Sequence, residues 1–265
     1  MTLLWGLIML DFNNTVIRRD TAANESLNEQ LNLIIDAALS SERQKQKGRR
    51  YLGASRLGVS CSRMLQYEYL SDPTLGSEFK GQILRIFEAG HLFETLAARW
   101  LMLAGFVIDT HDSSGKQFGF TAAAGKIAGH IDGVIRASPP DINLACPALW
   151  EAKSMNARSW RETLKKGLVL SKPVYAAQIA LYQAYMEESI AGISQNPCLF
   201  TAINKDTAEI YHELIPFDAA LAQNMSDKAV NIIRASEANE LLPRAFNSKD
   251  YFECKMCNYC DKCWG

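Results

Sequence analysis

Two short stretches of sequence, Lys126-Ile-Ala-Gly-His-Ile-Asp-Gly-Val-Ile135 and Ala148-Leu-Trp-Glu-Ala-Lys153, decide which fold this chain can adopt. Both are short and rich in residues that favour β-structure, and the break Pro139-Pro140-Asp141 separates them. Such a pattern is typical of two strands joined by a loop. We therefore expect these stretches to lie in one sheet.

The charged side chains of the two stretches are expected to converge. Because side chains alternate along a strand, Glu151 and Lys153 share one face while Ala152 points into the core. If the strands pair, Asp132 joins the same face. Two carboxylates and one ammonium group around a small volume suit a hard divalent cation, since Mg²⁺ prefers a few carboxylates together with water and phosphate. The same D…ExK pattern is also compatible with a surface salt bridge.

Other segments complete an α/β pattern around these strands. The apolar spacing predicts a mostly buried helix and, after Gly105, a short strand. Further along, another helix, two strands and a long amphipathic helix are expected, and no internal repeat is present. The expected elements are helices over 27–39, 83–103, 173–189 and 217–240, and strands over 106–108, 198–203 and 208–215.

Composition excludes several classes of protein. The chain has 265 residues, 48% of them hydrophobic, with 28 Lys and Arg against 29 Asp and Glu, so disordered and collagen-like classes are excluded. A net charge of −1 gives no overall attraction to nucleic acid, and any such attraction must come from local patches. The apolar run Leu3–Leu10 is too short to span a membrane, and it lacks the flanks of a signal peptide. We expect a cytoplasmic protein without a membrane span.

The cysteines crowd at the C-terminus. Four of seven lie in the last twelve residues, at positions 254, 257, 260 and 263. An odd number without a secretion signal argues for a reducing compartment and against a disulfide framework. Clustered thiols in that setting typically bind a metal. We divide the chain into an N-terminal helical and basic segment (1–50), a core (51–245) and a cysteine-rich tail (246–265).

The order of several motifs resembles the PD-(D/E)xK nuclease superfamily. The D…ExK arrangement is most similar to the RecB-like branch, which includes phage-encoded exonucleases and CRISPR-associated adaptation nucleases. Three further segments carry the resemblance, which covers roughly residues 51–264. They are Gly90-His-Leu-Phe-Glu94, the Q-x3-Y motif Gln178-Ile-Ala-Leu-Tyr182, and the segment Gly53–Tyr67 with its single cysteine, Cys61. Ile131 stands where the superfamily name has proline.

This resemblance implies a restriction-endonuclease-like αβββαβ core with a mixed sheet and extra helices. It implies that Mg²⁺ or Mn²⁺ is bound by Glu94, Asp132, Glu151 and the backbone carbonyl of Ala152, with His91 as an alternative to Glu94. Lys153 would position or activate the attacking water. Gln178 and Tyr182, one helical turn apart, would steady the active site and the DNA strand.

The resemblance also assigns a role to the tail. Cys61 with Cys254, Cys257 and Cys263 would form an iron–sulfur staple holding a [4Fe–4S] cluster. Cys260 leaves an alternative open, because it completes a local set of four cysteines that could bind Zn²⁺ without Cys61.

A basic segment lies between the ExK strand and the Q-x3-Y helix. Its cations suit phosphate contacts, and its tryptophan suits stacking on a base of a single strand. The alternative is a solvated helix face. The residues concerned are Arg158, Trp160, Arg161, Lys165, Lys166 and Lys172.

We therefore expect a metal-dependent DNA nuclease, an exonuclease by resemblance, that acts in phage-type recombination, repair or DNA processing. Its substrate would be single-stranded DNA or duplex ends, and the chain could form oligomers. Two alternatives stay open. One is a nuclease that trims spacer precursors together with a CRISPR-adaptation partner protein. The other is a non-catalytic nucleic-acid-binding module with a zinc tail.

Overall fold

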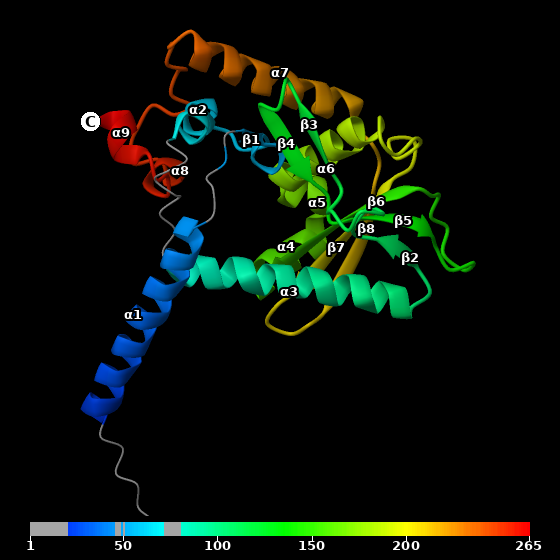
Figure 1. Ribbon diagram of the computed structural model, residues 1–265, viewed down its shortest axis with the longest axis horizontal. Helices are drawn as coiled ribbons and strands as arrows, with labels where there is room; N and C mark the ends of the chain where they lie inside the picture. The colour runs from blue at the N-terminus through cyan, green and yellow to red at the C-terminus, as the bar shows by residue number, and fades with distance from the viewer. Residues whose placement is uncertain (1–20, 46–48, 50, 72–80) are drawn as a thin grey trace, which may run out of the picture.

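The computed structural model describes residues 21–45, 49, 51–71 and 81–265. The apolar run at 3–10 lies outside the described residues, as do residues 46–48 and 50 of the basic run at 43–50. The helices α1 to α9 and the short 3₁₀ turn Ala54–Arg56 are distributed over the chain as Figure 1 shows. The helix bounds are α1 Thr21–Lys45, α2 Ser62–Leu70, α3 Gly81–Leu103, α4 Ala157–Lys166, α5 Leu168–Ser171, α6 Pro173–Met186, α7 Ala219–Glu237, α8 Phe252–Lys255 and α9 Cys260–Trp264.

Two sheets form the β-structure. The larger has the order β2-β5-β6-β7-β8, in which β6 and β7 are parallel and the other neighbours antiparallel. The smaller has the order β1-β4-β3, with β1 parallel and β3 antiparallel to β4. Their bounds are β1 Leu52–Gly53, β2 Val107–Asp109, β3 Gly119–Ala122, β4 Ile127–His130, β5 Gly133–Ala137, β6 Ala148–Met155, β7 Cys198–Asn204 and β8 Ile210–Ile215.

The stretch 126–135 is not the single strand that its sequence suggests. It divides into β4 and β5, which belong to different sheets. Ile131, fully buried between them, donates its backbone N–H to Phe118 O, next to β3, at 3.0 Å, so this part of the chain follows β3 and not β6. Asp132 consequently lies at the junction between the two sheets.

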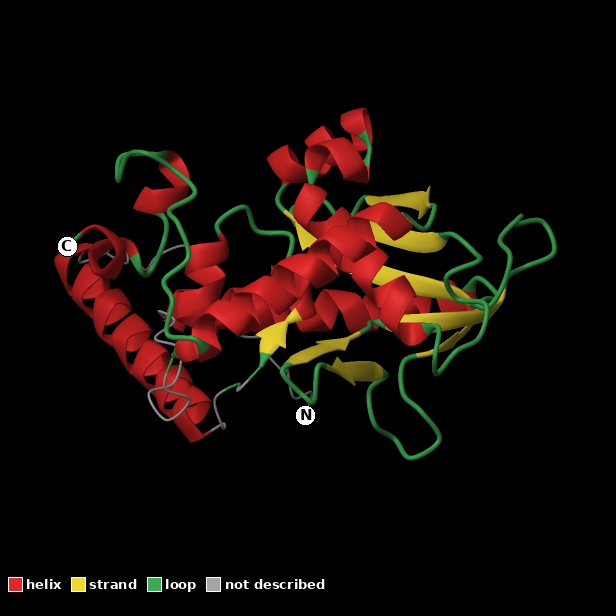
Figure 2. Cartoon of the chain, turned by 90° about the horizontal axis from the view of Figure 1, so that it is seen from above, coloured by secondary structure: helices red, strands yellow, loops and turns green. Residues whose placement is uncertain are grey.

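Helices cover both faces of the larger sheet (Figures 1 and 2). α6 is apolar almost all round and buried, as expected of a helix inside a core. It packs with one set of alternating strand residues, which includes Leu149 and Phe200. α3 covers the other set, where Ala97 and Leu101 meet Trp150.

The prediction that the helix over 83–103 is mostly buried is wrong. Only one side of α3 meets the sheet, and side chains such as Ile86, Leu92 and Leu96 are exposed. An apolar residue on a helix therefore need not face the core when the helix lies at the border of the molecule.

The predicted α/β class with a mixed sheet is confirmed. The succession α3, β2, β5, β6, α6, β7 follows the expected αβββαβ order, with β3 and β4 of the small sheet inserted between β2 and β5. Within the described part of the chain, no helix combines the length and apolar character needed to cross a membrane.

Candidate active site

Glu151 lies at the centre of the site, on the middle strand of the sheet. Its side chain is 0% exposed. Its Oε1 pairs with the Lys153 ammonium group and accepts a hydrogen bond from Gln178 Nε2 at 2.5 Å. Its Oε2 has no hydrogen-bond partner among the described residues. Because a buried carboxylate oxygen without a partner is costly, this atom marks a position for a cation or a donor.

Asp132 reaches the same place from the junction of the two sheets. The pairing of Gly133 with Trp150 brings the start of β5 beside β6. Asp132 Oδ2 accepts the backbone N–H of Ala152 at 2.8 Å and lies 3.9 Å from Lys153 Nζ. A backbone hydrogen bond therefore fixes one carboxylate oxygen in place.

Glu94 adds a third carboxylate from α3. Burial, followed by the charge of Asp132, raises the pKa of Glu94 to about 7, although Lys153 opposes the shift. His91 is 81% exposed, and its Nδ1 lies 3.7 Å from Glu94 Oε2. Of the two alternatives, the structure brings Glu94 to the cluster and leaves His91 in solvent.

The charges of this cluster are tightly linked. Burial, followed by the charge of Asp132, raises the pKa of Glu151 to about 8, although Lys153 opposes the shift. Burial alone would lower the pKa of Lys153, but Glu151 and Asp132 together raise it above its ordinary value. The ammonium group is therefore charged at neutral pH, and the carboxylates are short of positive charge.

α6 supplies one row of side chains to the site. Gln178 binds Glu151, and the ring of Tyr182 stands edge-on to Phe120 with centroids 5.9 Å apart. Burial raises the pKa of the Tyr182 hydroxyl above its ordinary value. Gly129 permits this packing, since a Cβ there would lie 2.7 Å from the Tyr182 ring. Tyr175, which no motif in the sequence singled out, also belongs to the site, because its ring centroid is 5.5 Å from Lys153 Nζ.

Glu94, Asp132 and Glu151 fit a hard divalent cation by the chemistry of their oxygen atoms and by the unpartnered Oε2 of Glu151. As they stand, no three His, Cys, Asp or Glu side chains in the described ranges already have the spacing of ligands to one ion. The role of the Ala152 carbonyl stays a prediction.

Five cysteines line a second place in the molecule. They surround a cavity of about 50 Å³ whose walls include aromatic rings. Burial raises the pKa of the Cys257 thiol, and the neighbouring cysteines raise it further. Both the predicted upstream cysteine and the alternative one are present, and the set is Cys61, Cys254, Cys257, Cys260 and Cys263.

α2 attaches this thiol cavity to the core. Gln66, almost fully buried, donates to Glu240 O at 2.6 Å and accepts from Leu242 N at 2.9 Å. Arg63 Nη1 lies 3.8 Å from Cys263 Sγ. A few side-chain bonds to the backbone thus position the tail.

The expected role of Trp160 needs correction. Its side chain is only 6% exposed, and its Nε1 donates to Ala202 O at 3.1 Å. The ring packs between α4 and the sheet and cannot stack on a base. A tryptophan among cations suggested a nucleic-acid contact, but the apolar side of a helix on a sheet takes the same residue.

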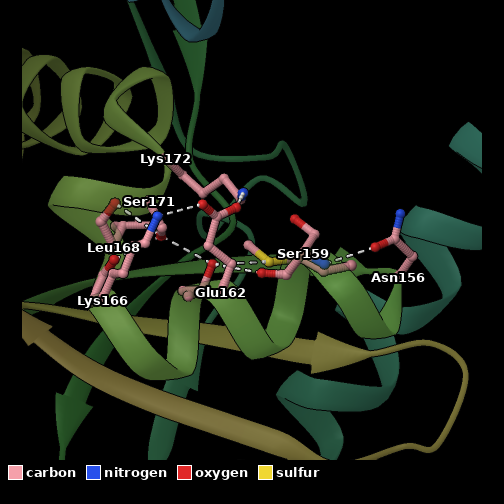
Figure 3. Close-up of polar contacts among 10 residues, drawn as sticks. Asn156, Ser159, Glu162, Lys166, Leu168, Ser171 and Lys172 are labelled. Atoms are coloured by element: carbon pink, nitrogen blue, oxygen red, sulfur yellow. Dashed lines mark hydrogen bonds and ion pairs between the residues drawn. The ribbon is translucent and has the colours of Figure 1, made fainter.

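The predicted cations divide into two groups. Lys166 and Lys172 both contact Glu162, at 2.9 and 3.0 Å, as Figure 3 shows. These hydrogen bonds lower the pKa of Glu162 to about 2. The other three follow one another at helical spacing on the outer face of α4, where all are exposed. They are Arg158, Arg161 and Lys165.

Comparisons with known proteins find similarity only among solved structures. No family model matches the sequence, and no curated protein matches it. Among solved structures, an alkaline exonuclease (LHK-Exo) from Laribacter hongkongensis is similar at 18% identity and a TM-score of 0.49, over 77% of this chain and 93% of that one. The same exonuclease in complex with dAMP has 18% identity and a TM-score of 0.43, over 70% of this chain and 91% of that one. The structure of SSO0001 has 18% identity and a TM-score of 0.43, over 87% of this chain and 96% of that one. Similarity at this level establishes no family for the chain.

Proposed function

We propose that this protein is a metal-dependent DNA nuclease that hydrolyses phosphodiester bonds. The observation that carries the proposal is the unpartnered Oε2 of Glu151, fully buried beside Asp132, Glu94 and Lys153. A buried cluster with three acids and one base serves poorly as a purely structural element, because its desolvation is only partly compensated. It is well suited to bind a divalent cation and a phosphate together.

Glu94, Asp132 and Glu151 would hold the cation, Mg²⁺ or Mn²⁺. When bound, it would lower the pKa of water and withdraw charge from the phosphate. Lys153 Nζ donates hydrogen bonds, so it can orient the attacking water and stabilise negative charge that develops on the phosphate oxygens. Gln178 keeps Glu151 Oε1 in place, and the Tyr175 ring limits the positions open to the ammonium group.

DNA is the proposed substrate because cations lie close in sequence to this site. Arg158, Arg161 and Lys165 form an exposed row on the helix that directly follows β6. Such a row contacts the backbone and carries no base-specific information. The preference for an exonuclease, and for a role in phage-type recombination, repair or DNA processing, follows the resemblance of the motifs described above.

The test is digestion of end-labelled single-stranded and duplex DNA with Mg²⁺, with Mn²⁺ and with a chelator. We expect mononucleotides or short products with either metal and intact DNA with the chelator. Glu151→Gln, which keeps the shape of the side chain, should yield no products. Intact DNA under every condition would exclude the proposal, and products with the chelator would exclude its metal dependence.

We further propose that the thiol cavity binds a metal: a [4Fe–4S] cluster held by Cys61, Cys254, Cys257 and Cys263, with Zn²⁺ held through Cys260 as the alternative. The donor set supports this, because five thiols line one small cavity. Anaerobic purification followed by metal analysis separates the two. A brown protein containing iron supports the cluster, a colourless one containing zinc supports the alternative, and a metal-free protein contradicts both.

A further inference from the structure

A row of aromatic rings extends from the thiol cavity to the surface. Phe246, which lines the cavity, stacks on Tyr251 with centroids 4.0 Å apart and an interplanar angle of 20°. Tyr251 in turn contacts Phe252, with centroids 4.9 Å apart. Tyr251 is 42% exposed and Phe252 is 62% exposed. The row therefore has a supported inner end and an open outer end.

This exposure is unusual for the molecule. In the described part of the chain, the exposed large apolar side chains are mostly aliphatic, and the aromatic ones are Phe87, Tyr251 and Phe252. Two of these are neighbours at the start of α8. Met256, one turn further on, is also largely exposed. A patch of rings that the fold leaves uncovered typically marks a binding surface.

Charged side chains border the outer end of the row. Lys249 is exposed and has no ion pair within the described residues, whereas Lys255 forms an ion pair with Asp250, with Nζ and Oδ1 3.6 Å apart. Glu253, the acid on α8, is directed to Ser60 Oγ. Lys249 thus leaves one cation available to an anion beside the row.

We propose that the aromatic row Phe246, Tyr251 and Phe252 is a stacking platform for single-stranded DNA, with Lys249 contacting the phosphates. The proposal rests on the proposed nuclease function and adds a second contact for its substrate. Each base has a flat face that can stack on a ring, so the platform holds a strand without selecting its sequence.

The place of the platform in the fold supports this occupant. The tail contacts α2 through Arg63 and Cys263, α2 follows β1, and β1 pairs with β4, the strand that leads to Asp132. A strand held on the tail is thus connected to the catalytic cluster through α2, β1 and β4. Flat rings beside an unpaired lysine favour a nucleic acid, whereas a protein partner would require only apolar volume.

The test is the binding of a fluorescent oligothymidylate of about 20 nucleotides, measured by fluorescence anisotropy. A chelator is present so that no strand is cut. Phe252→Ala removes the outer ring, Phe252→Leu keeps apolar volume without a ring, and Phe252→Trp keeps a ring. Leu103→Ala, at a similarly exposed site on α3, is the matched control. Thermal melts show whether each variant is folded.

We expect Phe252→Ala and Phe252→Leu to weaken binding about fivefold or more, with Phe252→Trp and Leu103→Ala close to the wild type. Equal binding by Phe252→Leu and the wild type overturns the platform, because apolar volume without a ring then suffices. Equal binding by all variants also overturns it. A wild type that binds through Phe252 but cuts no DNA with metal contradicts the nuclease function alone, and a wild type that cuts DNA but ignores the substitutions contradicts the platform alone.

Discussion

The catalytic cluster and the thiol cavity are the two sets of side chains to which we assign a metal, and the fold positions them by different means. Glu151 and Lys153 share one face of a central strand, and Asp132 is held by the backbone N–H of Ala152. Three of the five thiols lie on two helices of four and five residues, and Arg63 of α2 contacts one of them, Cys263. Short helices are not stable by themselves. The cluster is therefore organised by folding, whereas we expect the cavity to depend on a bound metal for its organisation.

The largest expected effect comes from Lys153→Ala. Loss of the ammonium group should lower the cleavage rate at least about a hundredfold, because no other described cation pairs with the carboxylates. Folding and DNA binding should persist, since the sheet itself is unchanged. Single-turnover cleavage of labelled DNA measures the effect, with Lys126→Ala as a control lysine that pairs with Glu237 elsewhere. Undiminished cleavage by Lys153→Ala contradicts the mechanism.

Substitution in the thiol cavity should change metal content and stability, whereas Lys153→Ala should change cleavage and leave folding intact. Cys61→Ser removes the proposed ligand between the tail and the core, so we expect loss of metal and a fall of roughly 2–5 kcal/mol in the free energy of unfolding. Urea denaturation and metal analysis measure both effects. Cys146→Ser, half-buried outside the cavity, should change neither. If the two variants behave alike, Cys61 has no special role.

A smaller effect concerns pH in protein freed of divalent cations. The pKa values of Glu94 and Glu151 are raised to about 7 and about 8, so folding favours their neutral forms. Their stabilising contribution is complete below the ordinary carboxyl pKa of about 4.5 and is lost as the pH rises through 7 and 8.

Urea denaturation should therefore show that the free energy of unfolding falls by about 1 kcal/mol or more between pH 5 and pH 8.5. Glu151→Gln should reduce the loss, because it carries no ionisable group at the buried position. Added Mn²⁺ should restore stability mainly at the higher pH, where the carboxylates are ionised. A pH dependence identical in the wild type and in Glu151→Gln would separate Glu151 from this titration.

Sequence indicated these two regions unequally. β6 and α6 could be predicted from their apolar residues. Alternation along the strand predicts that Glu151 and Lys153 share a face, and the resemblance of the Q-x3-Y motif implies that Gln178 lies at the site. The small sheet was not predicted, since β1 has two residues and β3 four, too few for a periodic pattern. Without the small sheet in the prediction, residues 126–135 were interpreted as one strand.

Single side chains show the same limit. Trp160 lies in a segment rich in cations, and only tertiary packing shows that its ring faces the sheet. Tyr175 could have been found, because it precedes Gln178 by three residues and Tyr182 by seven and so lies on the same side of a helix. Glu162 and Lys166 have the i,i+4 spacing typical of an ion pair on a helix. The pairing of Lys172 with the same acid depends on α5, between α4 and α6, and has no simple signature in the sequence.

The smallest expected effect tests the border of the catalytic region. Glu162→Ala releases Lys166 and Lys172 from their shared partner, so more positive charge becomes available to a phosphate backbone. We expect DNA affinity to rise about two- to threefold at low salt and the gain to vanish at high salt. Anisotropy at two salt concentrations measures it. Weaker binding would show that Glu162 orders these lysines for DNA and does not occupy them.

Calorimetric measurement of Mn²⁺ binding tests the central claim most directly, because it requires no substrate and no assumption about the pathway. The protein is first freed of divalent cations, and the wild type is compared with Glu151→Gln after both are shown to be folded. We predict saturable binding of Mn²⁺ by the wild type, with release of protons, and loss of that binding in Glu151→Gln. Equal binding by the two proteins, or none by the wild type, would contradict a metal site at Glu94, Asp132 and Glu151.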